Sequence, residues 1–405
     1  MPSSLESVHS ETLQHLWQAI DAELQELTDH HLRRTLVTIE AIDGPRVKIR
    51  DRWLVSWCTN DYLGLSSHPR LVQAASQAAA QWGIGARASR LLVGSTRLHT
   101  QLEERLAAFF RADAAVVFPS GYLTNLGVLG VLLSRDDVVL IDRLAHASLV
   151  EACRDSHATL RVFHHNDAAH VADLLSRYQS RRRRVIVTEG IFSMDGDRAP
   201  LARLLEVAQA HEALLYVDDA HGAFVVGQTG RGSPEAAGIS HDALLYMGTL
   251  GKALGCQGGF VVGPSSLMSL IHHRARTFLY TTALAVPVVA AAAEALCLVE
   301  EDASPRRRLE GNVSRLHDRL CRIGIGQTQT PSHVVSVRVG SSSEVCELSS
   351  AMWDRGIFAP AIRPPTVPEG TARLRISMTA LHTPQHIDQL IGALQELGRW
   401  GSGQS

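Results

Sequence analysis

Lysine is rare in this chain, and one of its two lysines lies where chemistry is possible. Lys252 occurs within "LLYMGTLGKALGCQGGFVVG" (residues 244–263), Lys48 is the other, and arginine makes up the rest of the 39 Lys and Arg residues. A coding bias toward arginine explains the general scarcity of lysine but not its retention at position 252. Because Lys252 follows an apolar run and has glycines around it, it can be partly desolvated, which lowers its pKa and makes it a nucleophilic amine.

Two carboxylates and a histidine follow another apolar run, in "LLYVDDAHGAF". Asp218 and Asp219 end the run, and His221 comes two residues later. A carboxylate at the end of a buried strand is costly unless it meets a cation, and a protonated pyridine nitrogen is one cation that fits. A metal ion is the alternative, since Asp-Asp-x-His offers ligands. No second ligand cluster lies nearby in the sequence, so we expect no metal.

Two further segments carry weaker signals. In "VVFPSGYLTNLG" a strand is expected to end at Pro119, and Ser120, Gly121 and Tyr122 then open a helix. Backbone N–H groups at a helix start form an anion site, although a Ser-Gly pair alone is a common turn. His146, in "LIDRLAHASLVEA", also follows a strand, where a histidine that caps a helix or lies in a loop is the ordinary interpretation.

The elements that carry these residues alternate between apolar strands and helices. Short apolar runs begin near residues 114, 138, 160, 184, 214, 244 and 259, and helical segments separate most of them. Near-continuous apolar strands that alternate with helices favour an α/β fold with a mostly parallel sheet covered on both faces. In such a sheet, chemistry collects at the carboxyl ends of the strands, where each candidate above is expected.

The chain divides into three predicted parts. Residues 1–57 form an N-terminal helix and hairpin segment, residues 58–295 a large domain, and residues 296–405 a small α+β C-terminal domain. A length of 405 residues favours more than one core. The apolar stretch 283–299 contains a proline and a glutamate and is read as a buried helix rather than a membrane span.

Taken together, the amine, the carboxylate, the histidine and the helix start indicate pyridoxal 5'-phosphate. Lys252 would form a Schiff base, Asp218 would hold a pyridinium, and the start of the helix at Gly121 would bind a phosphate. Each feature alone is common, but the four in this order on an alternating α/β chain are not.

The chain also resembles the α-oxoamine synthases, pyridoxal phosphate enzymes of fold type I. The resemblance runs from about "NDYLGLSSHPRL" to "ARLRISMTALH" and is most specific in "VTEGIFSMDGDRAPL", "VDDAHGAFVVGQTGRG" and "IRPPTVPEGTARLR". Within the family, the last segment is most similar to the branch that serves biotin synthesis. That branch condenses L-alanine with pimeloyl-CoA or pimeloyl-acyl carrier protein, with loss of CO₂.

The resemblance implies a set of cofactor contacts. Lys252 would hold the cofactor and then remove the Cα proton, Asp218 would bind the ring nitrogen, and His146 would stack on the ring. His221 and Ser193 would lie at the edge of the ring that bears the hydroxyl. The expected phosphate contacts are Ser120, Gly121, Tyr122 and Thr249, with Thr281 or Thr282 from the other subunit of a homodimer.

Substrate contacts are implied in the same way. Arg375 would hold the carboxylate of the amino acid as a bidentate pair, assisted by Asn60. Thr366 and an N-terminal arginine, Arg33 or Arg34, would contact the acyl part, and the match before residue 50 is too loose to choose between them. The segment 86–88, Ala-Arg-Ala, departs from the small residues usual in the family, which leaves the acyl preference open.

Bulk properties narrow the remaining possibilities. A net charge of −2 gives no reason to expect nucleic acid or an acidic membrane as a partner. Six cysteines without metal-ligand spacing, and an N-terminus unlike a signal peptide, favour the cytoplasm. The run "SRRRR" (180–184) is read as a solvated loop rather than a phosphate site. A synthase of the glycine C-acetyltransferase or 5-aminolevulinate type, or a non-catalytic binding module of the same fold, remains an alternative.

Overall fold

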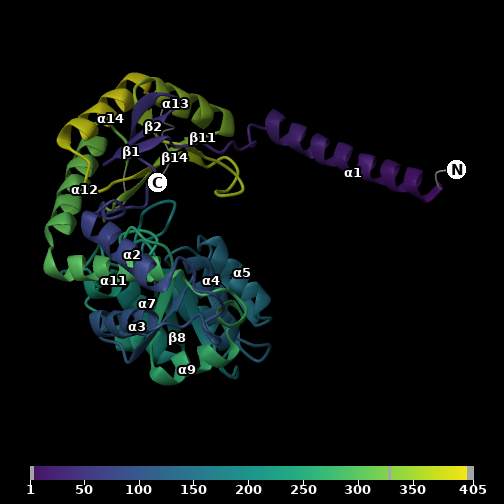
Figure 1. Cartoon of the computed structure of the whole chain (residues 1–405), viewed down its shortest axis with the longest axis vertical. Helices are drawn as coiled ribbons and strands as arrows, with labels where there is room; N and C mark the ends of the chain where they lie inside the picture. Colours follow the sequence, from purple (N-terminus) through teal and green to yellow (C-terminus); the bar gives the residue numbers. More distant parts are fainter. Residues whose placement is uncertain (1–3, 327–329, 399–405) are drawn as a thin grey trace.

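A seven-stranded sheet forms the centre of the larger part of the molecule, seen in the computed structural model of Figure 1. The structure describes residues 4–326 and 330–398. The strand order of the seven-stranded sheet is β4-β10-β9-β8-β7-β5-β6, and β10 alone runs antiparallel to its two neighbours. The strands are β4 (Ala114–Phe118), β5 (Val138–Asp142), β6 (Thr159–Phe163), β7 (Arg184–Glu189), β8 (Leu214–Asp218), β9 (Leu245–Thr249) and β10 (Gly259–Gly263). All seven apolar runs of the sequence are therefore strands of one sheet.

Both faces of this sheet are covered, which explains why its strands are apolar throughout. Val139 and Ile141 of β5 pack in one cluster with α4 and α5, whereas Val138 and Leu140 pack in another with α3, α6 and α11. The helices of this part are α2 (Pro69–Trp82), α3 (Arg97–Phe110), α4 (Gly121–Leu132), α5 (Ala147–Asp155), α6 (Ala168–Ser176), α7 (Leu201–Ala210), α8 (Ser233–Ala236), α9 (Ser265–Arg274), α10 (Arg276–Leu279) and α11 (Val286–Glu301), with a 3₁₀ turn at His241–Ala243. The expected fold class is confirmed.

Strand order brings the candidate residues to one edge. Strands β5, β7, β8 and β9 are consecutive and parallel, so their carboxyl ends lie side by side. Asp142, Glu189, Asp218 and Thr249 are the last residues of these four strands. The segments that follow carry His146, His221 and Lys252, which is the arrangement expected for a site in an open α/β sheet.

A smaller part of the molecule is built on two other sheets. One has the order β11-β14-β13, and the other joins the N-terminal hairpin to the C-terminal region in the order β1-β2-β3-β12. The elements are β1 (Ala41–Asp43), β2 (Arg46–Ile49), β3 (Arg52–Ser56), α12 (Ser304–Arg322), β11 (Val334–Gly340), α13 (Ser342–Asp354), β12 (Ile357–Phe358), β13 (Ala361–Ile362), β14 (Ala372–Ser377) and α14 (Pro384–Leu397). Because β12 pairs with β3, the hairpin packs with the C-terminal region.

The predicted division into three domains stays a prediction. Its two borders can be compared with the helices and strands of the structure. The first, after residue 57, falls just beyond β3, and the second, between residues 295 and 296, falls inside α11. Helix α11 packs on α2 and α3 of the larger part, and α12 follows it directly. The change from one part to the other therefore comes at the end of α11.

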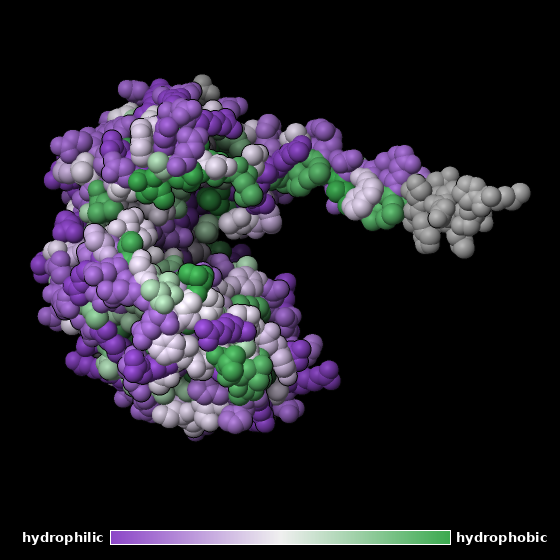
Figure 2. Space-filling view, in the orientation of Figure 1, coloured by the Kyte–Doolittle hydropathy of each residue, from purple (hydrophilic) through white to green (hydrophobic). Residues whose placement is uncertain are grey.

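Helix α1 (Ser4–Asp29) projects away from both parts of the chain (Figure 1). One face of α1 is apolar over several turns, with Leu13, Leu16, Trp17, Ile20 and Leu24 exposed. Figure 2 shows this apolar stripe and also the hollow between the two parts. Within the described chain, we find no helix with the length and apolar character needed to cross a membrane.

Candidate functional site

Two adjoining cavities lie between the carboxyl edge of the large sheet and the smaller part. The inner cavity, about 210 Å³, is lined by Gly121, Tyr122, Asn125, His146, Ser148, Glu189, Asp218, Ala220, His221, Met247, Thr249 and Lys252. The outer pocket, about 870 Å³, is lined by Arg34, Tyr122, Leu144–Ala147, Val150, Glu151, Arg154, Asp155, Ser193, Met194, Pro365 and Thr366. Tyr122 and His146 line both, so the two spaces adjoin at these residues.

Lys252 lies in the inner cavity with its amine against a histidine. Its Nζ is 2.8 Å from Nε2 of His221, and Nδ1 of His221 is 2.6 Å from the Tyr62 hydroxyl. Burial lowers the pKa of Lys252 to about 8, although Asp218 and Glu189 act in the opposite direction. Burial also lowers the pKa of His221 well below its usual value, and the Lys252 charge adds to this. The neutral imidazole can therefore accept a hydrogen bond from Lys252, and a far larger fraction of the amine is unprotonated near neutral pH than at the ordinary lysine pKa of 10.5.

Two hydrogen-bond donors hold the Asp218 carboxylate in place. Nδ2 of Asn125 donates to Oδ2 at 2.7 Å, and the backbone N–H of Ala220 donates to Oδ1 at 3.0 Å. The Asn125 carbonyl in turn accepts from the Tyr216 hydroxyl at 2.7 Å, which fixes the orientation of the amide. Asp219 points elsewhere and accepts from Ser233 and Tyr246. Of the two adjacent carboxylates, only Asp218 lines the cavity.

The start of helix α4 forms another wall of the inner cavity. Ser120 is the N-cap, and its hydroxyl accepts from the Leu123 N–H at 3.2 Å, so it supports the helix start rather than lining the cavity. A Cβ on Gly259 would come within 2.6 Å of the Gly121 Cα, so the neighbouring strand approaches this turn as closely as glycine allows. Exposed N–H groups at the start of a twelve-residue helix, beside Thr249, suit a phosphate.

His146 and Glu189 also line the inner cavity. Nδ1 of His146 accepts from the Ser148 N–H at 3.2 Å, and burial lowers the pKa of His146. The Glu189 carboxylate accepts from the backbone N–H groups of His146 and Ser193. Burial, together with the Asp218 charge, raises the pKa of Glu189 to about 8, the value to which burial lowers that of Lys252. Both groups therefore change charge in the same pH range.

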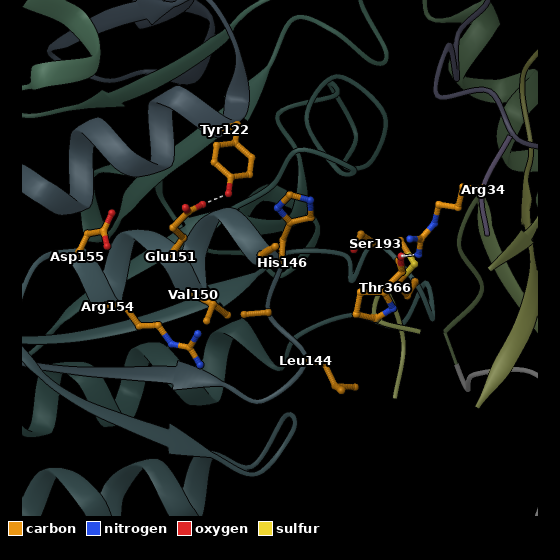
Figure 3. A pocket seen from close by; sticks show the side chains of 14 residues that line it. Arg34, Tyr122, Leu144, His146, Val150, Glu151, Arg154, Asp155, Ser193 and Thr366 are labelled. Carbon is orange, nitrogen blue, oxygen red and sulfur yellow. Dashed lines mark hydrogen bonds between the residues drawn. The ribbon is translucent and has the colours of Figure 1, made fainter. Parts of the chain in front are cut away.

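The outer pocket combines residues from five separate segments of the chain (Figure 3). One guanidinium nitrogen of Arg34 donates to the Pro364 carbonyl at 3.2 Å and to the Thr366 hydroxyl at 3.3 Å. Arg33 instead points back to Thr28 in α1, at 3.4 Å. Of the two arginines left open by the sequence, Arg34 is the one that lines the pocket with Thr366. On the other side of the pocket, Tyr122 donates to Glu151.

Arg375 lies near the cavities but lines neither of them. Its Nε donates to the Ser193 carbonyl at 2.5 Å and one terminal nitrogen to the Ser377 hydroxyl at 2.8 Å. Oδ1 of Asn60 is 3.5 Å from both terminal nitrogens. The guanidinium is therefore held by Ser193 and Ser377, and both of its terminal nitrogens also face Asn60. Ser193, expected at the edge of the cofactor ring, lies in the outer pocket and contacts Arg375 through its backbone.

Several sequence alternatives can be compared with the structure. Thr281 and Thr282 line neither cavity of the single chain. The arginines of the run 181–184 include Arg182, paired with Asp137, and Arg184, which donates to the His211 carbonyl; both serve the local fold. In the described part of the chain, the group with metal-ligand spacing is His164, Asp167 and His170 at the surface, away from Asp218 and His221.

Sequence reasoning missed three residues of the site. Asn125 orients Asp218, Tyr62 contacts His221, and Glu189 anchors the backbone at His146. Tyr62 and Glu189 lie inside the quoted segments "NDYLGL" and "VTEG", so their position beside recognised residues was the available signal. Asn125 is five residues beyond Ser120 on α4, and only the helix geometry brings it over the end of β8.

Comparisons with known proteins agree with this geometry. Residues 53–394 match the family "Aminotransferase class I and II". The 8-amino-7-oxononanoate synthase of Anaeromyxobacter dehalogenans is 44% identical over 93% of this chain and 94% of its own. That of Geobacter sulfurreducens is 41% identical over 94% of this chain and 98% of its own. The chain belongs to the 8-amino-7-oxononanoate synthase family.

Solved structures extend this family relationship. A serine palmitoyltransferase from S. paucimobilis with bound pyridoxal phosphate and myriocin is 31% identical, covers 95% of this chain and 98% of its own, and has a TM-score of 0.90. The 8-amino-7-oxononanoate synthase of Francisella tularensis is 27% identical, covers 85% and 97%, and has a TM-score of 0.74. In the present family member, the inner cavity offers an amine, a carboxylate and a helix start, which fits pyridoxal phosphate.

Proposed function

We propose that this chain condenses L-alanine with a pimeloyl thioester and releases CO₂, the free thiol carrier and 8-amino-7-oxononanoate. The observation that carries the proposal is the inner cavity, in which Lys252, His221 and Asp218 lie together, in a chain more than 40% identical to named synthases over most of its length. The cofactor is pyridoxal phosphate, whose ring withdraws electrons and stabilises negative charge at the Cα of the amino acid.

The residues of the inner cavity divide the work. Asp218, oriented by Asn125, would accept a hydrogen bond from the protonated ring nitrogen of the cofactor. Gly121, Tyr122 and Thr249 would hold the phosphate at the start of α4. Lys252 has a pKa of about 8, so its amine can take the Cα proton and later return one. His221, neutral and 2.8 Å from Nζ, keeps that amine in position.

Substrate binding falls to residues around the outer pocket. Arg375 and Asn60 bind the carboxylate of L-alanine, since the terminal guanidinium nitrogens are directed toward Asn60. The outer pocket, with about 870 Å³ between Arg34, Thr366 and Tyr122, takes the acyl chain and its carrier. Arg34 is the only one of the two N-terminal candidates in the described chain that lines this pocket, and its charge suits the distal carboxylate of a pimeloyl group.

We also propose a homodimer in the cytoplasm. Ile84, Leu91, Leu92 and Val93 are 64–74% exposed, so this short segment leaves four large apolar side chains open to solvent. A second copy that covers them would place Thr281 or Thr282 at the phosphate of its neighbour, as expected from the family resemblance. Six free cysteines suit a reducing compartment.

A related synthase is the second candidate, and one observation favours it. The TM-score of 0.90 to serine palmitoyltransferase exceeds that of 0.74 to the Francisella synthase, so the shape of the chain is compatible with another amino acid and a longer acyl group. The identity of 44% to the Anaeromyxobacter synthase favours L-alanine and pimeloyl instead.

The deciding experiment measures turnover for pairs of substrates. L-alanine, glycine and L-serine are each combined with pimeloyl-CoA, pimeloyl-acyl carrier protein, acetyl-CoA, succinyl-CoA and palmitoyl-CoA, and kcat/KM is compared. We expect L-alanine with a pimeloyl thioester to exceed every other amino acid and acyl group by about a hundredfold. A larger kcat/KM for L-serine with palmitoyl-CoA, or for glycine with a short acyl group, would replace the proposal with the corresponding synthase.

A further inference from the structure

A hairpin-like turn connects the large sheet to the substrate arginine. We call residues 191–198 the 191–198 turn. The turn is closed by a β-bridge between Ile191 and Arg198 and by a hydrogen bond from the Phe192 N–H to the Asp197 carbonyl at 2.9 Å. Ser193 and Met194 of this turn line the outer pocket, as Figure 3 shows for Ser193. The turn therefore forms part of the substrate site.

One side of the turn is attached to the smaller part of the molecule. Asp195 accepts from Arg373 of β14 and from Arg338 of β11, the latter at 3.0 Å. The Ser193 carbonyl accepts from Nε of Arg375. A Cβ on Gly196 would come within 1.9 Å of the Val334 carbonyl oxygen, so the turn contacts β11 with no spare room. A shift of the turn would consequently move the guanidinium of Arg375.

The other side of the turn is attached to the large sheet by His165. Nδ1 of His165 contacts Oδ1 of Asp142 at 2.9 Å, and Nε2 contacts Oδ2 of Asp197 at 2.7 Å. The Asp142 carboxylate is fully buried at the end of β5, and Asp197 belongs to the turn. Because ionised carboxylates only accept, both ring nitrogens donate and the ring is an imidazolium. The Asn166 amide nitrogen also lies 3.2 Å from Nε2, but its shorter bond, at 2.7 Å, is donated to Asp197. The edge of the ring also contacts Phe192.

In the described chain, the Asp197 carboxylate has one side-chain donor besides His165, and that donor is uncharged. Asn166 donates to the same Oδ2 of Asp197 at 2.7 Å, but Oδ1 of Asp197 is buried without a hydrogen-bond partner in the described chain. Without the imidazolium, Asp142 and Asp197 would face each other as two carboxylates with a neutral group between them. Such a pair is strongly unfavourable in a partly buried site, so the turn would move away from β5.

We propose that His165, held as a cation between Asp142 and Asp197, is a positioning residue that sets the substrate-binding arginine Arg375 through the 191–198 turn. It touches neither cavity. Its effect is on the affinity for the carboxylate of the amino acid. This inference rests on the proposed role of Arg375, whereas the charge state of His165 does not depend on which substrates are used.

The ring charge can be tested directly on the native protein. Burial alone would lower the pKa of His165. The bonds to Asp142 and Asp197 outweigh this effect and raise the pKa of His165 to about 9. Those two carboxylates are the ionisable groups that face the ring from β5 and from the turn, and the exposed His164 lies beside it in the chain. Below pH 9 both ring N–H groups are present and both contacts hold, and as the pH rises through 9 one of them is lost.

In ¹⁵N-histidine NMR, with the signal assigned by its loss in His165→Gln, we expect both ring N–H groups at neutral pH. A ring that titrates near pH 6.5 would overturn the proposal.

Kinetics test the positioning role. In His165→Gln we expect KM for L-alanine to rise about tenfold, while KM for the thioester, and the affinity of the apoprotein for pyridoxal phosphate, change less than about twofold. The double variant His165→Gln, Asp197→Asn removes the unpaired carboxylate and should recover most of the affinity for L-alanine. His164→Gln, one residue away and exposed, is the matched control and should match the native chain.

The outcomes separate a positioning role from a merely structural one. Equal losses in both KM values and in cofactor affinity, without recovery in the double variant, would assign His165 to general stability. An unchanged KM for L-alanine in a folded His165→Gln protein would overturn the proposal outright. Should that variant fail to fold, Asp197→Ala decides instead, because it removes the contact of the turn to His165 and must raise KM for L-alanine without changing KM for the thioester; an unchanged KM for L-alanine would overturn the proposal. If no thioester is turned over at all, the NMR result stands and only the proposed function fails.

Discussion

The inner cavity and the outer pocket share Tyr122 and His146 but are built in different ways. Nearly all of the inner cavity comes from the ends of adjacent strands and the start of α4, within one domain. The outer pocket needs Arg34 before the first strand, Met194 from the 191–198 turn, and Thr366 between β13 and β14. The first is fixed by the topology of one sheet, and the second by how separate parts of the chain meet. We therefore expect inner-cavity substitutions to affect the chemistry and outer-pocket substitutions to affect only substrate preference.

The largest effect is expected for Lys252→Ala. Loss of the amine removes both the attachment of the cofactor and the base, so turnover should fall by at least about a thousandfold with every substrate pair. The cofactor absorbance that depends on the lysine should vanish as well. Lys48→Ala is the matched control, because the only other lysine pairs with Asp51 at the surface. Full activity of Lys252→Ala would contradict the mechanism.

Asp218→Asn should come next. A neutral amide cannot hold a proton on the cofactor ring, so kcat should fall by about a hundredfold while KM for the thioester stays unchanged. Asp219→Asn is a control one residue away, since Asp219 bonds to Ser233 and Tyr246 and lies outside the cavity. We expect it to lower the melting temperature with kcat nearly unchanged. If both variants lost kcat equally, the distinction between the two carboxylates would be wrong.

Arg34→Gln tests the outer pocket. We expect KM for the pimeloyl thioester to rise about fivefold, with kcat and KM for L-alanine unchanged, because one partly exposed charge is lost. Arg33→Gln is the matched control, since Arg33 contacts Thr28 and does not line the pocket. Steady-state kinetics of both variants with pimeloyl-CoA and acetyl-CoA would measure the difference. Equal effects of the two substitutions would mean that the segment acts as a whole and not through Arg34.

The smallest effect concerns the stability of the apoprotein. The pKa of Lys252 is about 8 in the folded chain, below its ordinary value of 10.5. The folded chain therefore binds fewer protons than the unfolded chain between these values, and the free energy of unfolding rises with pH over that window. Below pH 8 the buried ammonium carries its full cost. Lys252→Met should therefore raise the melting temperature by about 5 °C near neutral pH, and the gain should shrink toward pH 10.5. A gain that did not depend on pH would point to packing instead of charge.

Much of the fold and of the inner cavity could be predicted from the sequence because both depend on local patterns. Apolar runs identify β4–β10, and chemical residues directly after such runs must lie at the carboxyl edge of the sheet. That reasoning reached Asp218, His221 and Lys252 one by one. It did not reach Asn125 or Tyr62, because their contacts to Asp218 and His221 span 93 and 159 residues of sequence.

The sequence by itself determined which groups are available. These are the amine of Lys252, which an arginine could not replace, the carboxylates at the strand ends, and the helix start at Gly121. Only the tertiary structure decided which of them act together. It separates Asp218 from Asp219, selects Arg34 over Arg33, and places His165 between Asp142 and Asp197. The physical reason is that strand and helix patterns depend on neighbouring residues. Contacts between charges depend on which distant segments the packing of the two parts brings within hydrogen-bond reach.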